Sequence, residues 1–184
     1  MDRTFVSSVV LPSRLFSTGR LLLEGVRFPC FLKRGESMAR TGTCLCGEVR
    51  YRVDGEIGPP VACHCQYCRR GHGAPFSLVA LVLRSQFVWL EGEEHVRRFD
   101  TPGGGRREFC SLCGTRFFNG PRIAPESISL VLASFDEEWT QAPVAHVNVE
   151  TKAPWHIIAD EAPQYPRLPR LPFDPDSEPS DSRD

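Results

Sequence analysis

The central part of the chain contains short stretches in which apolar and polar residues alternate or apolar residues run together. Glu48–Val53 alternates with a period of two residues and ends at the turn signal Asp54-Gly55. Phe76–Leu83 is a longer apolar run, typical of a buried strand. Further strands are predicted at Phe87–Leu90, His95–Phe99, Thr115–Phe118, Ile128–Ala133, Ala145–Glu150 and Trp155–Ile158. Short strands at regular spacing predict a mainly β domain, built as an antiparallel sheet or an open barrel.

Helical periodicity is scarce along the chain. The best candidate for a helix is the short segment Gln66–His72. The stretch Thr101–Gly105 has the glycine content of a phosphate-binding loop, but no lysine follows it and no helical pattern begins after it. We therefore expect an ordinary loop at this position.

The composition divides the chain into three parts. Residues 38–160 hold all the paired cysteines and the predicted strands, and form the expected zinc domain. Residues 1–37 form an N-terminal extension with two alternatives: the natural start is Met38, or Met1 begins a transit-like segment with arginines and serines. Residues 161–184 are rich in Pro, Asp and Ser, which predicts a disordered, acidic tail.

Length and charge exclude several classes of protein. With 184 residues and 41% hydrophobic content, the chain can form one domain with a real core. Its 22 basic and 23 acidic residues give a net charge of −1, whereas a general nucleic-acid binder needs a surplus of cations. No apolar run approaches the ~18 residues of a membrane-spanning helix. We expect neither nucleic acid nor membrane as a partner, and the sequence sets no oligomeric state.

Cysteine is the most informative residue type. The chain has 8 cysteines, and seven of them fall in the motifs Cys44-x-Cys46, Cys63-x-Cys65-x-x-Cys68 and Cys110-x-x-Cys113. Two sulfurs at such short spacing can point at one ion, whereas a disulfide between near neighbours closes a small and strained loop. The spacing favours metal binding over disulfides or a redox dithiol. Metal thiolates persist in reducing compartments, so we expect a cytoplasmic protein.

One knuckle motif identifies the first expected site. Cys110-x-x-Cys113 is followed by Gly114, and a glycine with positive φ lets backbone N–H groups point at the sulfurs. One knuckle supplies two ligands, so a structural zinc needs a second pair. Cys44 and Cys46 are the remaining two-cysteine unit and also precede a glycine. We therefore predict a structural zinc bound by these four cysteines.

The remaining cysteines Cys63, Cys65 and Cys68 form the second expected site. Three protein ligands with an open fourth position are typical of a catalytic zinc. The alternative is a closed site with a fourth protein ligand. Three residues are candidates for that ligand: Cys30, His64 and His72. An extended chain would turn His64 to the side opposite its two cysteine neighbours.

Charged and titratable side chains flank the cysteines. Arg69-Arg70 follows Cys68, and Arg106-Arg107 precedes Cys110. These arginines either offset thiolate charge or hold an anionic substrate, because guanidinium binds carboxylates bidentately. Arg69 and Arg70 are the candidate substrate-binding residues.

Two histidines lie near the second expected site in the sequence, His64 and His72. Histidine titrates near neutral pH, so both are candidate proton carriers. The alternative is that they are histidines at the surface or beside the ligands, without a chemical role.

The cysteine motifs, taken together in order, resemble the glutathione-dependent formaldehyde-activating enzyme (Gfa/CENP-V) family. The residues that carry the resemblance are Gly42–Tyr51, Cys63–Arg70, Gly73–Phe76, Phe109–Thr115, His146 and Lys152–Trp155. The resemblance covers about residues 40–165. It implies a β-tent fold of antiparallel sheets held by zinc knuckles, with two zinc ions per chain. It also implies a structural zinc at Cys44, Cys46, Cys110 and Cys113 and a catalytic zinc at Cys63, Cys65 and Cys68.

The family resemblance implies an activity: condensation of formaldehyde with glutathione to S-hydroxymethylglutathione, by an enzyme of the carbon–sulfur lyase class. The expected partners are glutathione or another small thiol and a small aldehyde. Two alternatives stay open, because a fold does not fix a substrate. One is a non-catalytic, zinc-stabilised binding module of the CENP-V type, and the other is a thiol-redox or aldehyde-detoxifying enzyme that uses a different thiol or aldehyde.

Overall fold

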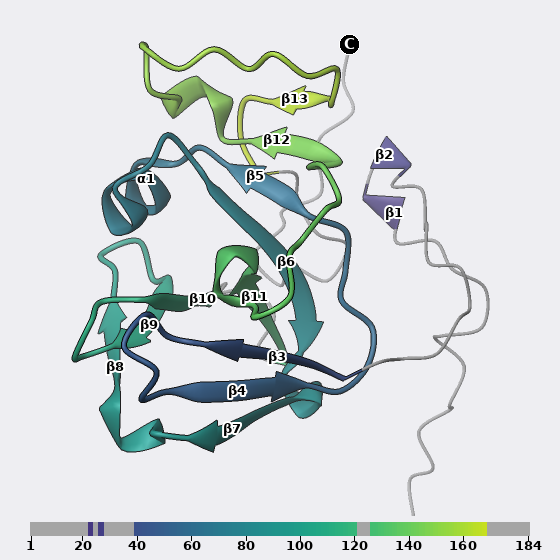
Figure 1. Ribbon diagram of the computed structural model, residues 1–184. Helices are drawn as coiled ribbons and strands as arrows, with labels where there is room; N and C mark the ends of the chain where they lie inside the picture. The colour runs from purple at the N-terminus through teal and green to yellow at the C-terminus, as the bar shows by residue number, and fades with distance from the viewer. Residues whose placement is uncertain (1–21, 24–25, 28–38, 121–125, 169–184) are drawn as a thin grey trace, which may run out of the picture.

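The protein is mainly β, as predicted, in the part of the chain that its computed structural model describes: residues 22–23, 26–27, 39–120 and 126–168 (Figure 1). The described strands form sheets of eight, three and two strands. The two-stranded sheet consists of β1 (Leu22–Leu23) and β2 (Val26–Arg27). The predictions about the start at Met1 or Met38 and about Cys30 fall outside the described residues.

The three-stranded sheet lies in front of the larger sheet in Figure 1. It has the order β3 (Arg40–Thr43), β4 (Arg50–Val53), β7 (Phe87–Glu91), and both pairings are antiparallel. Gly42 and Tyr51 are paired residues on neighbouring strands, and the Tyr51 ring occupies the place of a side chain at Gly42. A Cβ at Gly42 would lie 2.1 Å from the Tyr51 ring, so this aromatic packing requires glycine.

The large sheet is antiparallel except at one edge. The parallel pairs are β12 with β5 and β12 with β13, and all other neighbours are antiparallel. The strand order is β13 (Gln164–Tyr165), β12 (Ala145–Val147), β5 (Val61–Cys63), β6 (Ser77–Leu83), β11 (Ser127–Val131), β10 (Arg116–Gly120), β9 (Arg106–Cys110) and β8 (Val96–Asp100).

The hydrophobic core lies between the small sheet and one half of the large sheet. Tyr51 and Val53 enter it from β4, while Phe117, Phe118 and Leu130 enter it from β10 and β11. Edge-on aromatic contacts tie the two sheets together, such as the 5.1 Å separation between the Trp89 ring on β7 and the Phe117 ring on β10. The core therefore fixes the positions of the strand ends that carry cysteines.

The described helices are short, and one of them contains part of a cysteine motif. The helix α1 (Gln66–His72) has the predicted bounds and follows β5 directly. It ends at Gly73, which adopts the left-handed conformation. The remaining helices are single 3₁₀ turns: η1 (Arg84–Gln86), η2 (Glu93–His95), η3 (Leu132–Ser134) and η4 (Val149–Thr151).

Two predicted strands end earlier than expected. The strand predicted to reach Ala133 ends at Val131, because the chain turns so that the Ser134 hydroxyl donates to the Val131 carbonyl. The strand predicted to reach Glu150 ends at Val147, because Asn148 adopts a left-handed conformation with φ of 59°. Both endings depend on single polar residues rather than on hydrophobicity.

Two predictions near the C-terminus are wrong. Residues 155–158 form no strand: Lys152 donates to the His156 carbonyl in a turn, and Trp155 and Ile157 are 71% and 82% exposed. The disordered tail predicted from residue 161 also starts too early, because Gln164–Tyr165 pairs with β12. Residues 169–184 lie outside the described residues.

Candidate metal centres

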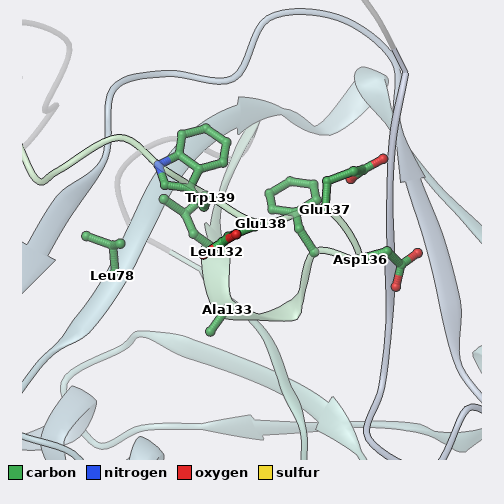
Figure 2. A pocket seen from close by; sticks show the side chains of 8 residues that line it. Leu78, Leu132, Ala133, Asp136, Glu137, Glu138 and Trp139 are labelled. Carbon is green, nitrogen blue, oxygen red and sulfur yellow. The ribbon is translucent and has the colours of Figure 1, made fainter.

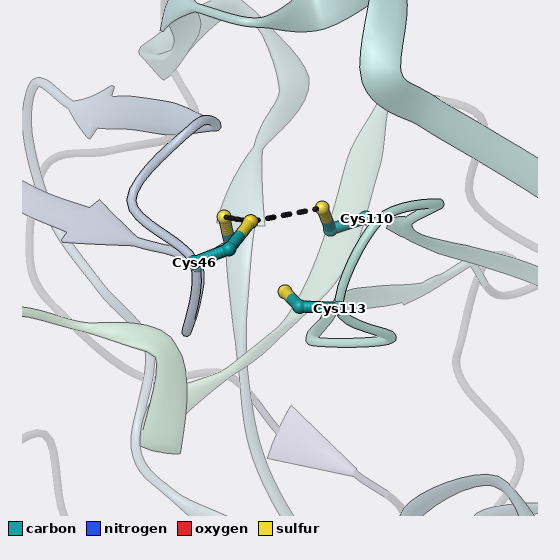
Figure 3. A group of neighbouring side chains, drawn as sticks. Cys46, Cys110 and Cys113 are labelled. Atoms are coloured by element: carbon teal, nitrogen blue, oxygen red, sulfur yellow. Dashed lines mark hydrogen bonds between the residues drawn. The ribbon is translucent and has the colours of Figure 1, made fainter.

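Four cysteines from the two sheets meet at the end of the core, and we call them the four-cysteine group. Cys44 follows β3 in the small sheet, and Cys110 ends β9 in the large sheet. The sulfurs of Cys44, Cys46, Cys110 and Cys113 all lie within 4.8 Å of one another. Figure 3 shows the Cys46, Cys110 and Cys113 side chains turned toward a common centre. The structure therefore brings together the four cysteines that sequence spacing had grouped.

Two similar turns build the four-cysteine group. The Gly47 N–H donates to the Cys44 carbonyl, and the Gly114 N–H donates to the Cys110 carbonyl, both at 2.9 Å. These glycines have φ values of +84° and +79°. A Cβ at either position would meet no atom within 4 Å, so the backbone conformation and not the space requires glycine.

Thr115 connects the two turns. Its hydroxyl oxygen accepts a hydrogen bond from the Leu45 N–H at 2.9 Å and lies 3.3 Å from the Cys113 sulfur. Burial raises the pKa of Cys113, but hydrogen bonds with Thr115 and Cys46 together outweigh burial, and the pKa falls to about 6. The thiolate, which is the metal-binding form, is therefore favoured at this position.

The other three cysteines lie on one continuous segment, and we call them the three-cysteine group. Cys63 ends β5, Cys65 is the N-cap residue of α1, and Cys68 lies in its first turn. Their sulfurs also lie within 4.8 Å of one another. The Cys65 sulfur accepts the Cys68 N–H at 3.3 Å, so the helix cap and the sulfur cluster are the same structure.

Two asparagine amides from distant strands approach the sulfurs of this group. The Asn148 amide donates to the Cys63 sulfur at 3.3 Å, and the Asn119 amide lies 4.0 Å from the Cys68 sulfur. The left-handed backbone at Asn148 places its amide, because the residue sits at the turn between β12 and η4. Neither asparagine was predicted from the sequence, since nothing local distinguishes Asn119 or Asn148 from a solvent-exposed asparagine.

Without a metal, the three sulfurs share protons unequally. Hydrogen bonds within the group lower the pKa of Cys65 and raise the pKa values of Cys63 and Cys68. Crowded thiolates repel one another, so only one of them ionises readily. A metal cation that binds all three sulfurs would replace the remaining protons.

Positive charge surrounds the three-cysteine group. Arg107 lies close enough to Cys65 that its charge helps to lower the pKa of that thiol. Arg116 reaches α1, where its Nε donates to the Gly71 carbonyl at 3.0 Å. Burial lowers the pKa of His72 to about 4, and the charges of Arg116 and Arg107 act in the same direction. His72 is therefore a neutral imidazole at pH 7.

His64 points away from the sulfurs, as the extended chain predicts, and belongs to a different cluster. Its Nε2 lies 2.9 Å from Nδ1 of His146, whose Nε2 lies 3.0 Å from the Asp160 carboxylate. The His156 ring stacks on the His64 ring, with 5.7 Å between the two ring centroids. Burial lowers the pKa of His64 to about 4, and the neighbouring His146 contributes. This buried chain of side chains anchors the segment between Cys63 and Cys65 to β12.

The remaining predicted site residues have mixed outcomes. Among the described residues, neither His64 nor His72 contributes a nitrogen to either cysteine group. The side chain of Arg69 has a buried Nε without a hydrogen-bond partner, whereas Arg70 is exposed. Arg116 was not singled out from the sequence. It lies within the predicted strand Thr115–Phe118, and nothing in that strand indicates its contact with α1.

A hollow of about 390 Å³ lies elsewhere on the molecule (Figure 2). Its apolar surface includes Trp139, which stacks on Phe135 with 5.9 Å between ring centroids and lies under the Arg40 guanidinium. Three carboxylates and three further residues complete the lining: Asp136, Glu137, Glu138, Leu78, Leu132 and Ala133. No cysteine lines this hollow. None of the helices in the described ranges is long and apolar enough to cross a membrane.

Both cysteine groups have the composition of metal-binding sites. Four convergent cysteine sulfurs suit a tetrahedral structural zinc, and three suit a zinc with one open position. The amide donors from Asn119 and Asn148 are the kind of contacts that orient ligands and moderate thiolate charge. The fold and its sites therefore define a small β protein with two cysteine centres able to bind metal.

Comparison with known proteins identifies the family. The sequence profile of the glutathione-dependent formaldehyde-activating enzyme family, GFA, matches residues 39–151. A curated Halomonas elongata protein, named provisionally as a glutathione-dependent formaldehyde-activating enzyme, is 26% identical over 125 residues, which cover 64% of this chain and 80% of that protein. A crystal structure of a Rhodobacter sphaeroides protein matches with a TM-score of 0.47 and 24% identity, covering 54% of this chain and 90% of that one. The chain belongs to the GFA family.

Proposed function

We propose that this protein is a zinc-dependent enzyme of the carbon–sulfur lyase class that forms S-hydroxymethylglutathione from formaldehyde and glutathione, or acts on a closely related aldehyde and thiol. The observation that supports this function best is the three-cysteine group, which brings together three sulfurs, one fewer than a closed tetrahedral zinc site, with positive charge beside them. Membership of the GFA family, whose description names a glutathione-dependent formaldehyde-activating enzyme, supports this choice of reaction and substrate class.

The two cysteine groups have different roles in this proposal. Cys44, Cys46, Cys110 and Cys113 hold a structural zinc that joins the two sheets. Cys63, Cys65 and Cys68 hold the catalytic zinc. When bound there, zinc acts as a Lewis acid that favours the thiolate form of an incoming thiol at neutral pH. Reduced cysteines at both groups support a cytoplasmic location.

The reaction balances without oxidation or reduction. The sulfur of the thiol adds to the aldehyde carbon, and the thiol proton ends on the former carbonyl oxygen. His72 lies next to the site, where its buried Nε2 is close to the Asn119 side chain. The pKa of His72, about 4, makes its imidazole a weak base. We therefore assign His72 the role of a neutral imidazole that orients the reacting proton and does not take it up.

A turnover assay tests this function. The zinc-loaded full chain is mixed with ¹³C-formaldehyde and glutathione, and the S-hydroxymethyl signal is followed by NMR against the uncatalysed rate. We expect acceleration by the wild type and by the control Arg98→Gln, which changes an exposed arginine that pairs with Asp100. Cys65→Ser should keep one zinc and the fold. Its rate should fall at least about a hundredfold, because even the loss of a residue that supports a metal ligand costs about 10–100-fold.

Two results would contradict the proposal. One is full activity in a Cys65→Ser protein that has lost its second zinc. The other is a wild type that binds two zinc ions but does not accelerate the reaction of formaldehyde, or of another small aldehyde, with glutathione or other thiols. The second result would favour a non-catalytic binding module instead.

A further inference from the structure

Two arginines beside the three-cysteine group lack an acidic partner in the described part of the chain. Other arginines of the same sheet are paired: Arg98 contacts Asp100 at 2.8 Å, and Arg106 contacts Glu108 at 3.6 Å. Arg107 and Arg116 instead use one N–H group each on backbone carbonyls, those of Arg106 and Gly71. Their positive charges therefore have no neighbouring carboxylate.

The strand register places these arginines on one face of the sheet. Arg107 on β9 pairs with Asn119 on β10, and Arg116 on β10 pairs with Phe109 on β9. The Arg116 guanidinium lies over the Phe109 ring at 4.9 Å, which fixes the arginine between the ring and α1. The amide of Asn119 on the same face reaches toward the three-cysteine group.

Unused hydrogen-bonding atoms gather at this face. Arg107 Nε and Arg116 Nη1 are buried N–H donors without a partner. Asn119 Oδ1 and His72 Nε2 are also buried nearby, and these two side chains interact with each other. A buried donor without a partner costs free energy, and native proteins keep such groups mainly where a ligand or water satisfies them.

Thiolate charge alone does not balance the two guanidiniums. Three thiolates around one Zn²⁺ leave a single negative charge, whereas Arg107 and Arg116 carry two positive ones. The mutual repulsion is visible in Arg116, because burial and then the charge of Arg107 lower its pKa. One further anion would neutralise the pair, and a carboxylate fits because guanidinium binds it with two parallel hydrogen bonds.

We propose that Arg107 and Arg116 form a carboxylate-binding subsite that selects a thiol bearing a carboxylate group over a neutral thiol. This inference rests on the proposed function, and it assigns the anchor to the β9–β10 face instead of to the exposed Arg70. In this arrangement the carboxylate binds to the arginines while the thiol of the same molecule reaches the open position of the three-cysteine group.

Binding of S-methylglutathione to the zinc-loaded full chain tests the subsite by calorimetry. This probe has both carboxylates but no thiol, so its affinity does not depend on turnover. Arg107→Gln and Arg116→Gln should each raise its dissociation constant at least about tenfold, which matches the loss of a hydrogen bond to a charged group. Arg98→Gln, an exposed arginine on the same sheet, is the matched control and should bind like the wild type.

Two companion measurements exclude a simple folding defect. Arg107→Lys keeps the charge but not the paired donors, so it should weaken binding less than Arg107→Gln. The dimethyl ester of S-methylglutathione should bind the wild type as poorly as the diacid binds Arg107→Gln. Zinc content and melting temperature are recorded for every variant.

The outcomes separate this inference from the proposed function. Unchanged binding in folded, zinc-loaded Arg107→Gln and Arg116→Gln overturns the subsite, as does equal binding of diacid and diester. No binding of S-methylglutathione to the wild type also overturns it, even if formaldehyde turnover is found. Arginine-dependent binding without turnover supports the subsite and contradicts the proposed reaction.

Discussion

The two cysteine groups use the same ligand chemistry in opposite structural settings. The four-cysteine group takes one pair from each sheet, so its ligands are distant in sequence and a metal there cross-links the core. The three-cysteine group comes from the single segment that joins β5 to α1. Its surroundings are distant side chains: two asparagine amides and unpaired arginines.

This difference separates stability from reactivity. A metal that joins distant segments restricts the unfolded chain strongly, whereas one bound within a single short segment restricts it little. Four sulfurs are enough for a tetrahedral zinc, whereas three leave one position to another ligand. We therefore expect the three-cysteine group to contribute less to folding than the four-cysteine group.

The largest expected effect comes from breaking the cross-link. Cys110→Ser should lower the free energy of unfolding by several kcal/mol or prevent folding, because a structural zinc supplies about 10–16 kcal/mol in small zinc-finger peptides. Cys68→Ser should retain a cooperative transition near that of the wild type. Thermal unfolding with zinc analysis measures both, and equal losses of stability in the two variants would remove the distinction between the groups.

A smaller effect is expected at the amide that contacts Cys63. Asn148→Gly keeps the left-handed backbone but removes the amide donor, so zinc affinity at the three-cysteine group should fall about 10–100-fold. Zinc at the four-cysteine group should be unaffected. Chelator competition with spectroscopic cobalt substitution distinguishes the two sites.

The matched control for this variant is Glu150→Gln. It breaks the ion pair between Glu150 and Arg167 on the same C-terminal segment without touching a sulfur. If Glu150→Gln weakens zinc binding as much as Asn148→Gly does, the effect comes from the segment's position and not from the amide.

The smallest expected effect concerns pH. Burial lowers the pKa of His64 to about 4, below its usual value of 6.5, so the unfolded state binds the proton more readily than the folded state. Stability from the neutral form is complete above pH 6.5 and should decline as pH falls toward 4. His64→Gln should lower stability at pH 7 and flatten this decline. Urea unfolding with zinc analysis at each pH measures it, and an unchanged slope would exclude His64 as the source.

Features that depend on neighbouring residues were predictable from the sequence. The bounds of α1 and the three-cysteine group follow from local spacing, and both are present in the structure. Each pair of the four-cysteine group is also a local motif, and the two pairs were matched because each is a two-cysteine unit. The strand at Phe76–Leu83 was also predicted to within one residue, because its apolar run is long. In each case the signal lies within a few residues of the feature.

Features that depend on contacts between distant residues were not predictable. Asn148 contacts Cys63, and His146 contacts His64, across more than eighty positions of the chain. Gln164–Tyr165 becomes a strand because β12 offers a free edge, and its own composition indicates a tail. Conversely, the exposed apolar residues Trp155 and Ile157 gave a strand signal although no neighbouring strand pairs with them in the described structure.

The parallel edge of the large sheet is completed late in synthesis. The chain is made from its N-terminus, so all four cysteines of the four-cysteine group are added before β12. Asn148 and the strand that supports His64 are added only afterwards. The sulfurs that would cross-link the two sheets are therefore complete before the residues that support the three-cysteine group have been made.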